Sequence, residues 1–278
     1  MNTLFLHDGA TASRHAVQIL SSITSMSYYA VYTEQTISFA KYGRVIIVIN
    51  SDMNLKEIVA ALQQNLVKKE VGLIGVDMPD MAWQKICRQI NEKMGELLCF
   101  TACVHTTPNN EEIIQAGERL QALVPTQSDS QDKVVLQAIE TFLLRHNTCV
   151  LATGYADTVR ATPIEYMYDN GKLYIFSEGG KKFANIYRNP QVSVAVFDSY
   201  AGFEKLAGLQ IEGMCRMIEP DEAIYATIAE KRGITKKKIA VMPVILHVLE
   251  IKLTTAVFLW AGFLKRGKAV RQVYRFSE

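Results

Sequence analysis

The stretch FSEGGKKFANIYRNPQVSVAVFD, residues 176–198, decides how the second half of the chain is read. Two glycines and two lysines, residues 179–182, come directly before a helix-like run that Asn189-Pro190 ends. Glycine lets a backbone approach a ligand closely, and a helix start offers unpaired N–H donors and the positive end of the helix dipole. The stretch predicts a helix over residues 181–188 whose start binds an anion, although a basic turn on a solvated surface would have the same sequence.

Short strand-like runs surround this stretch. Turn signals such as Asp169-Asn170-Gly171 separate the runs, which indicates hairpins. Helix-like segments cover residues 133–146, 181–188 and 220–231. Successive strands joined by hairpin turns predict an antiparallel β-barrel with added helices. The runs are CVLATGY (149–155), RATPIEYMY (160–168), KLYIF (172–176), VSVAVF (192–197), LQIEGMCRMIE (209–219) and VILHVLEIKL (244–253).

The N-terminal half has a different pattern. Continuously apolar runs alternate there with amphipathic segments, as in a parallel sheet covered by helices on both faces. The apolar runs are TLFL (3–6), YYAVY (28–32), RVIIVIN (44–50), VGLIGV (71–76) and LLCFTACV (97–104), and the helix-like segments cover residues 12–23, 55–69, 82–94 and 111–123. This order predicts a doubly wound parallel sheet and resembles flavodoxin-like domains.

A flavodoxin-like domain holds the FMN phosphate in the turn after its first strand. The corresponding turn here is HDGATASRH, in which Gly9, Thr11 and Ser13 are suitable in type but not in the usual spacing. The later loops, residues 50–52 and 77–80, lack the aromatic residues that flank a flavin ring. A nucleotide site and a domain used for packing or regulation therefore both remain open.

The domain boundary is predicted at VPTQSDSQD, residues 124–132. This segment loses the apolar pattern and gathers Pro, Ser, Gln and Asp. We therefore expect a flavodoxin-like domain over residues 1–124, a linker over 125–132 and a barrel domain over 133–278.

The motifs between residues 133 and 276, taken together, resemble the FMN-binding split barrel of the pyridoxamine 5'-phosphate oxidase-like superfamily. An entry helix is followed by CVLATGYAD, RATPIEY, DNGKLYIFS, GGKKFANIYRNP, VSVAVFD and QIEGMCRMIE in the order found in that family. The resemblance implies an FMN cofactor, a small-molecule substrate and a homodimer whose site lies between the two barrels.

The resemblance also implies a set of phosphate contacts. Lys182, and with it Lys181, would contact the FMN phosphate, and Arg160 or Thr162 would reach the same group. Ser177 would lie near the ribityl phosphate. Independently of the family, strand alternation places Arg160 and Thr162 on one face, so that the two can act together. An exposed strand charge is the alternative for Arg160.

Further contacts concern the flavin ring. The resemblance places Thr162, Pro163 and Ile164 beside the ring. Trp260-Ala261-Gly262 resembles the Trp-x-Gly element that packs on FMN from the partner subunit, and Arg271 has the spacing of the arginine that follows it. An aromatic residue that closes the barrel would explain Trp260 equally well.

Departures from the family narrow the reaction. The stretch FLKRGKAVR, residues 263–271, has no histidine where the vitamin-processing oxidases hold the pyridoxal group. Glu165 stands where those enzymes carry a lysine for the substrate phosphate, and an acid there would repel a phosphate. Residues 206–208 replace the polar pair expected at the fifth strand. We expect an FMN-dependent oxidoreductase of a small molecule other than pyridoxamine phosphate.

Two alternatives belong to other functional classes. Similar split barrels serve haem use, so the protein could be a haem-binding or haem-utilisation protein with His146 or His247 facing the groove. It could also be a non-catalytic flavin or ligand sensor with the N-terminal domain as its output.

Composition excludes several other classes. A net charge of +2 gives no basic field for nucleic acid, and no apolar run is long enough to span a membrane. Five cysteines without a C-x-x-C pair, and no basic leader before the first strand, favour the reducing cytoplasm. Scattered histidines predict no metal site. The basic cluster TKKK, residues 235–238, is predicted as a solvated loop, with an anion or partner site as the alternative.

Overall fold

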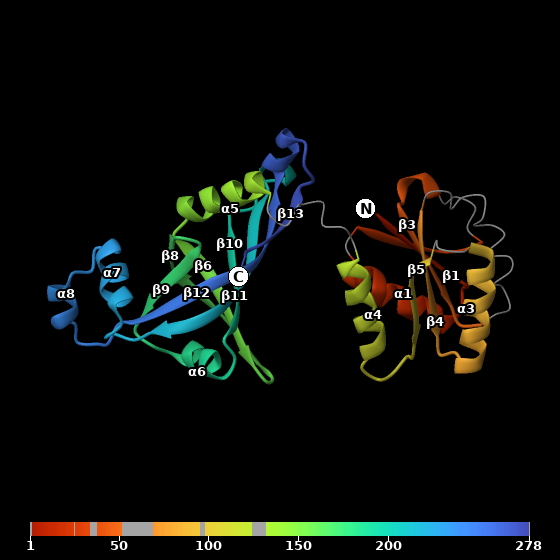
Figure 1. Ribbon diagram of the computed structural model, residues 1–278, viewed down its shortest axis with the longest axis horizontal. Coiled ribbons are helices and arrows are strands. Elements are labelled where there is room, and N and C mark those ends of the chain that lie inside the picture. The colour runs from red at the N-terminus through yellow and green to blue at the C-terminus, as the bar shows by residue number, and fades with distance from the viewer. Residues whose placement is uncertain are drawn as a thin grey trace. The chain divides into compact units, whose positions relative to one another are not determined.

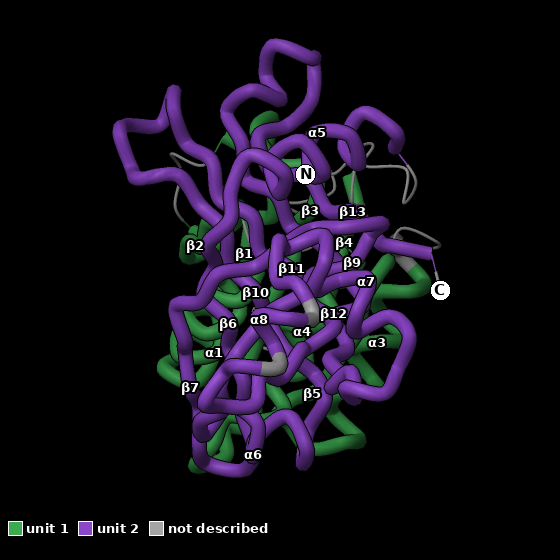
Figure 2. The backbone as a smooth tube through the Cα atoms, turned by 90° about the vertical axis from the view of Figure 1, so that its left-hand side faces the viewer, with its two compact units in different colours: residues 1–125 green, residues 126–278 purple. Residues whose placement is uncertain are grey.

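The computed structural model describes residues 2–24, 26–33, 38–51, 69–94, 98–123 and 132–277. The chain forms two compact units, residues 1–125 and residues 126–278 (Figure 2). The helix predicted over residues 55–69 and the linker predicted over 125–132 lie outside the described residues, except for residues 69 and 132. The domain boundaries given above therefore stay predictions.

The N-terminal unit contains a five-stranded parallel sheet in the order β2-β1-β3-β4-β5. This order confirms the predicted doubly wound, flavodoxin-like sheet. Its described elements are β1 (Thr3–His7), α1 (Thr11–Ile23), β2 (Ser27–Val31), η1 (Phe39–Lys41), β3 (Arg44–Ile49), β4 (Glu70–Val76), α3 (Asp80–Met94), β5 (Leu98–Val104) and α4 (Glu111–Ala122).

Two apolar clusters cover the two faces of this sheet. Leu4 and Leu6 pack on the side of α3, whereas Phe5 packs on the side of α1 and α4 (Figure 1). Successive side chains of a strand point to opposite faces, so a strand that is buried on both faces has to be apolar at every position. The unbroken apolar runs of the sequence follow from this burial.

Arg44 is the largest charged group in the core of the N-terminal unit. It is only 1% exposed, and its guanidinium donates to Glu70 at 2.6 and 2.8 Å. It also donates to the carbonyl oxygens of Leu120, at 3.1 Å, and Leu123, at 2.8 Å. The guanidinium thereby joins the start of β3 to the end of α4, where helix carbonyls lack partners.

The C-terminal unit is a curled antiparallel sheet with the strand order β7-β6-β10-β11-β12-β9-β8, in which β13 pairs with β12. This curled sheet confirms the predicted split barrel. Its strands are β6 (Thr148–Tyr155), β7 (Thr158–Glu165), β8 (Met167–Asp169), β9 (Lys172–Ser177), β10 (Gln191–Phe197), β11 (Ala207–Ile218), β12 (His247–Trp260) and β13 (Arg271–Arg275).

Helices cover parts of the curled sheet. They are α5 (Lys133–Arg145), α6 (Lys181–Arg188), α7 (Ala223–Lys231) and α8 (Lys236–Ala240), with single turns η3 (Phe203–Lys205) and η4 (Ala261–Arg266). In the main core α5 packs on the sheet through Phe142, whose ring centroid lies 4.9 Å from that of Phe258. Figure 1 shows α7 and α8 as a pair at one end of the unit.

Three parts of this unit differ from the predictions. RATPIEYMY is two strands, because Tyr166 turns into the core and its hydroxyl donates to the carbonyl oxygen of Leu143 at 2.8 Å. The basic cluster is not a loop: Thr235 caps α8 by accepting from the backbone N–H of Lys238. The last predicted strand extends to Trp260, and β13 was not predicted.

The Arg44 contacts predict a specific loss of stability. Arg44→Met removes the donors from two carbonyl oxygens and from Glu70, so we expect the N-terminal unit to lose about 2–3 kcal/mol. Urea unfolding followed at Trp83, in a Trp260→Phe background, measures this unit because the chain has only 2 tryptophans. Arg88→Met, on the exposed surface of α3, should change stability by less than about 0.5 kcal/mol. Equal effects of the two substitutions would contradict the role of Arg44.

Candidate functional site

The start of α6 has a backbone that only glycine adopts easily. Gly179 and Gly180 have φ angles of +127° and +111°, a region that residues with a Cβ atom rarely adopt. Gly180 is the N-cap residue, and its position carries no side-chain capping bond. The first backbone N–H groups of α6 are therefore not capped by a neighbouring side chain. The helix itself covers Lys181–Arg188, as predicted.

Polar side chains hold α6 against β6. Asn185, which is 6% exposed, donates to the hydroxyl of Thr153 at 3.3 Å and to its carbonyl oxygen at 3.4 Å. Asn189 donates to the carbonyl oxygen of Gly154 at 3.1 Å. These bonds fix the helix start relative to the barrel, which a ligand site requires.

Lys182 is the buried member of the lysine pair. Its side chain is 6% exposed, and Nζ donates to the carbonyl oxygen of Gly179 at 2.6 Å. Burial and, to a smaller extent, the nearby charge of Arg160 lower the pKa of Lys182. Among the described side chains of residues 132–277, no carboxylate forms an ion pair with Lys182 or Arg160. Lys181 is exposed at the same helix start.

Arg160 and Thr162 belong to the same cluster. In the β6–β7 register Arg160 lies opposite Thr153 and Thr162 lies opposite Leu151, so both point to the face on which α6 packs. The Thr162 hydroxyl is buried and has no hydrogen-bond partner in the structure. A buried hydroxyl without a partner costs free energy that a bound ligand can offset. Arg160 and Thr162 lie on one strand face, as predicted, and the Arg160 side chain is exposed, as the alternative of an exposed strand charge predicted.

The other predicted barrel contacts fall in three places. Ser177 ends β9, and its hydroxyl exchanges hydrogen bonds with the backbone of Gly179 at 3.2 and 3.3 Å. Ile164 packs against the main core. Pro163 is exposed and, by strand alternation, faces away from Thr162 and Ile164. The structure therefore does not bring the three β7 residues together on one face.

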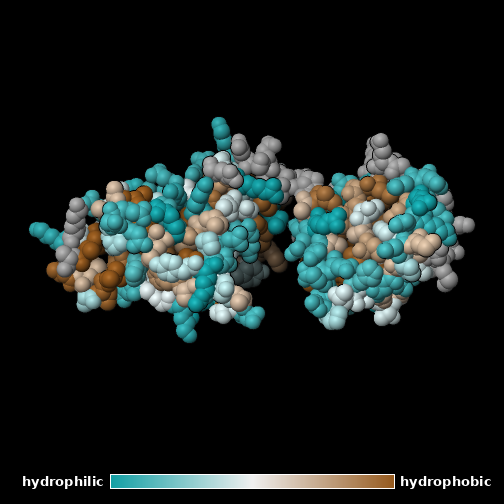
Figure 3. Space-filling view, turned by 60° about the horizontal axis from the view of Figure 1, so that its bottom comes forward, coloured by the Kyte–Doolittle hydropathy of each residue, from teal (hydrophilic) through white to brown (hydrophobic). Residues whose placement is uncertain are grey.

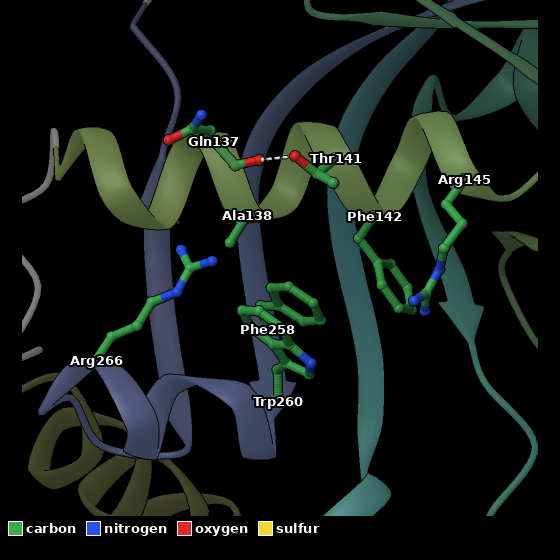
Figure 4. A pocket seen from close by; sticks show the side chains of 8 residues that line it. All are labelled: Gln137, Ala138, Thr141, Phe142, Arg145, Phe258, Trp260 and Arg266. Carbon is green, nitrogen blue, oxygen red and sulfur yellow. Dashed lines mark hydrogen bonds between the residues drawn. The ribbon is translucent and has the colours of Figure 1, made fainter.

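Trp260 lies at the end of β12 in an aromatic group. Its ring is stacked on Phe258, at 5.6 Å between centroids and 4° between planes, and Phe263 lies 5.1 Å away. The guanidinium of Arg266 lies 5.1 Å from the Trp260 ring centroid. These residues border a cavity of about 170 Å³ under α5, shown in Figure 4 with its lining residues Gln137, Ala138, Thr141, Phe142, Arg145, Phe258, Trp260 and Arg266.

Trp260 and Arg271 are not brought to the Lys182 cluster within one chain. Arg271 pairs with Leu259 and borders a different cavity with it, on the face of β12 opposite Trp260. At its other end β12 begins at His247, which pairs with Ser177. Roughly 40 Å of strand, at about 3.3 Å per residue, therefore separates Trp260 from the end of β12 at which Ser177 lies.

Two residues near the cluster, Asn185 and Thr153, were not predicted, and neither was the ion partner of Glu165. Asn185 and Thr153 were not singled out, although a polar residue on the apolar face of a short helix was a usable signal. Glu165 forms an ion pair with Arg232, which lowers its pKa, so its charge is balanced by a residue far along the chain. No spacing rule in the sequence indicates that pair.

The two histidines considered as haem ligands differ. Both ring nitrogens of His146 are engaged, with the carbonyl oxygen of Phe142 and with Asp198, each at 2.8 Å. The ring centroid of His247 lies 5.2 Å from that of Phe183, the residue that follows Lys182 in the sequence. Of the two, only His247 is near the start of α6.

In the N-terminal unit, the turn after β1 contains the carboxylate of Asp8. Gly9 has a φ of +87°, and Asp8 accepts from the backbone N–H of Ala10 at 3.0 Å and of Asn50 at 2.7 Å. Thr11 is exposed, and the buried Ser13 hydroxyl has no partner. A negative charge fixed in this turn disfavours a phosphate beside it.

The described residues contain neither of two further features, a membrane-spanning helix and a metal-binding cluster. No described helix has the length and apolarity needed to span a bilayer. Within the described ranges, no three His, Cys, Asp or Glu side chains gather closely enough to hold a metal ion.

The lowered pKa of Lys182 predicts how stability depends on pH. Between that lowered pKa and 10.5 the unfolded chain binds more protons at this position than the folded chain, so stability rises with pH across the window. Lys182→Met should therefore stabilise the ligand-free protein at about pH 7, and the gain should shrink toward about pH 10. Urea unfolding of both proteins at the two pH values measures this. A variant that is less stable at both would show that the bond to Gly179 is mainly structural.

Comparisons with known proteins agree with the geometry of the barrel. The model of the family Pyridoxamine 5'-phosphate oxidase matches residues 135–257, which is less than half of the chain. A search of curated protein sequences gave no match.

Three solved structures illustrate the similarity. An FAD-binding protein from Mesorhizobium loti is 21% identical, with 43% of this chain and 90% of that chain covered and a TM-score of 0.35. General Stress Protein 26 from Bacillus anthracis is 17% identical, with 51% and 98% covered and a TM-score of 0.38. The haem storage protein HutZ from Vibrio cholerae is 17% identical, with 42% and 88% covered and a TM-score of 0.36. Residues 135–257 therefore carry the pattern of the pyridoxamine 5'-phosphate oxidase family, which confirms the resemblance seen in the motifs of the C-terminal half.

Proposed function

We propose that the C-terminal unit binds FMN by its phosphate at the start of α6, and that the protein is a homodimeric, cytoplasmic FMN-dependent oxidoreductase of a small molecule. One observation carries this proposal. The residue Lys182 is 6% exposed and lies near Arg160, and no carboxylate of the described residues pairs with either. The five cysteines are free, as a reducing compartment requires.

A phosphate group fits this place chemically. An unpaired buried ammonium is costly, and a dianion beside it offsets that cost through charge-assisted hydrogen bonds. Gly179 and Gly180 leave room for close approach, since a Cβ at Gly179 would meet nothing within 4 Å. The uncapped N–H groups of α6 and the unpartnered Thr162 hydroxyl supply further donors.

The chemistry follows from the cofactor and from what the chain adds to it. FMN, when bound, supplies transfer of hydride or electrons. The residues of this chain would hold the phosphate through Lys182 and Arg160 and position the ring along β7 near Thr162. Arg232 is engaged by the Glu165 carboxylate, so this cation is not free to bind a substrate phosphate. A substrate other than pyridoxamine phosphate is therefore favoured.

A second candidate function has one observation in its favour. His247 lies beside Phe183 at the start of α6 and has no hydrogen bond to its ring within the described part of the chain. An imidazole in that position can ligate haem iron. Haem binding through His247 is the competing function, and a flavin sensor with the N-terminal unit as output would share the FMN site.

The phosphate contact predicts a difference between two flavins. Lys182→Met should weaken FMN binding by about tenfold to a hundredfold, because one charge-assisted contact is lost. Binding of riboflavin, which has no phosphate, should change little. Fluorescence titration of both flavins against wild type and variant measures the two effects separately. Lys181→Met is the matched control, since its side chain is exposed at the same turn, and its effect should be several-fold smaller.

Two outcomes would contradict the FMN proposal. Equal losses of FMN and riboflavin would show that Lys182 acts on the fold and not on the phosphate. A Soret band after addition of haemin, lost in His247→Ala while FMN fails to bind, would favour the haem function.

The dimer in this proposal rests on the positions of Trp260 and Ser177. The two residues lie at opposite ends of β12, so Trp260 can reach flavin at the start of α6 only from a second copy. The outer faces of β10, β11 and β12 carry half-buried or exposed residues such as Phe197, Met214 and Leu259, which a partner barrel could cover.

A shared site predicts complementation between two defective variants. In a heterodimer of Lys182→Met and Trp260→Ala chains, one site carries both substitutions and the other carries neither. Each homodimer should bind FMN weakly, whereas the heterodimer should show one tight site. Titration of co-expressed, doubly tagged heterodimer measures this stoichiometry. The absence of any tight site would place Trp260 outside the partner's flavin site.

A further inference from the structure

A second cavity in the C-terminal unit has an unusual lining. A groove of about 620 Å³ lies between α7, α8 and residues 242–246. Apart from Glu230, its lining is apolar, and it includes Tyr225, Ala229, Ile239 and Ile245. None of the residues of the Lys182 cluster lines it. The volume lies within the range of sites that bind small molecules, about 300–1,000 Å³.

The groove has a rigid floor. Tyr174, Ile218, Tyr225, Ile228 and Val248 form a separate apolar cluster, and Ile239 packs against it. The hydroxyl of Tyr225 donates to the carbonyl oxygen of Leu246 at 2.7 Å and so joins α7 to the opposite wall. That hydroxyl is already engaged, which leaves an apolar surface for a ligand.

Ion pairs hold α7 to the barrel. Lys231 contacts Asp169 at 2.6 Å, and Arg232 contacts Glu165. At the start of the segment Glu222 contacts Arg216 at 2.9 Å. The groove therefore belongs to the folded unit and does not depend on a loosely attached helix.

Apolar side chains remain exposed at the groove. Ile245 lines it and is 67% exposed, and the neighbouring Val241 is 81% exposed. Figure 3 shows hydrophobic atoms gathered at the end of the unit where α7 and α8 lie. A contiguous apolar surface of this kind marks a binding site more often than isolated exposed residues do.

Positive charge is carried by α8, the helix that contributes Ile239 to the groove lining. Lys237 and Lys238 are exposed on α8, between the lining residues Ile234 and Ile239 in sequence. Lys238 donates to the carbonyl oxygen of Gly233 at 3.3 Å, and neither lysine pairs with a carboxylate among the placed side chains. These lysines belong to the basic cluster of residues 235–238, for which an anion or partner site was the alternative prediction.

We propose that this groove binds a fatty acid, with the hydrocarbon chain along the apolar lining and the carboxylate at Lys237 and Lys238. The combination of an apolar trough of small-molecule size with exposed ammonium groups on the helix that forms one wall matches an amphiphile with a single anionic end. The inference is independent of flavin binding, because the two sites share no residue.

Three ligands with one chain length test the proposal in the intact protein. Dodecanoate, dodecanol and dodecyltrimethylammonium, each below its micelle-forming concentration, are titrated by displacement of a fluorescent apolar probe. We expect dodecanoate to bind at least about tenfold more tightly than dodecanol, through its charge-assisted contacts, and the cation to bind least. Equal binding of all three, or no binding of dodecanoate, would overturn the proposal.

Variants locate the binding. Ile245→Asp places a negative charge on an exposed lining position and should weaken dodecanoate binding by about tenfold. Leu144→Asp, at a position on α5 that is 69% exposed, is the control and should have no effect. Replacing Lys237 and Lys238 by Ser should abolish the preference for dodecanoate over dodecanol.

Glu230, the acid in the groove lining, gives a test in which dodecanoate binding should become tighter. Glu230→Gln removes a negative charge from the lining, so dodecanoate should bind more tightly in this variant while dodecanol binding stays unchanged. An unchanged dodecanoate affinity in Ile245→Asp, or capture of an acidic peptide or vesicle in place of the fatty acid, would show that the groove has another occupant.

Discussion

The structure of the candidate site depends on one unbalanced charge in the barrel. Two other buried ions among the described residues are paired: Arg44 has Glu70 and two carbonyl oxygens, and Glu250 has Lys172 at 3.0 Å and Arg216 at 2.8 Å. Lys182 has the neutral carbonyl oxygen of Gly179 and the ring of Phe183, whose centroid lies 5.1 Å from Nζ, with a second cation close by. The described part of the fold pairs these two charges and leaves Lys182 without an anion, so a bound anion would offset the cost of burying that charge. The family match and the glycine turn agree with that reading.

Rigidity makes the unbalanced charge useful. Lys182 would turn toward solvent if α6 could tilt, because an ammonium group is most stable in water. The bonds from Asn185 and Asn189 to β6 prevent this tilt, and the glycine turn sets the direction in which the chain leaves β9. The site is thus assembled before a ligand arrives, which reduces the ordering cost of binding.

Local signals in the sequence predicted the elements that local physics determines. The helix over residues 181–188 was predicted correctly because a glycine pair and an Asn-Pro pair bound it on both sides. The parallel sheet of the N-terminal unit was predicted correctly from its unbroken apolar runs. The strand break before Met167 was missed, because the burial of Tyr166 depends on α5, and β13 was missed because its short run is polar at three of its positions. Burial of Lys182 without a partner is likewise a tertiary property.

Two glycine-containing turns of this chain, one after β1 and one after β9, show why a motif alone does not define a phosphate site. Both turns follow a strand, lead into a helix and contain a glycine with positive φ, Gly9 in one unit and Gly180 in the other. In the N-terminal turn the carboxylate of Asp8 already accepts from two backbone N–H groups. In the C-terminal turn the charges close to the helix start are those of Lys181, Lys182 and Arg160, the carboxylate of Glu178 is exposed, and the helix has no side-chain cap. Since a carboxylate repels a phosphate as strongly as an ammonium attracts it at equal distance, the charge in each turn favours the turn of the barrel as the proposed phosphate site.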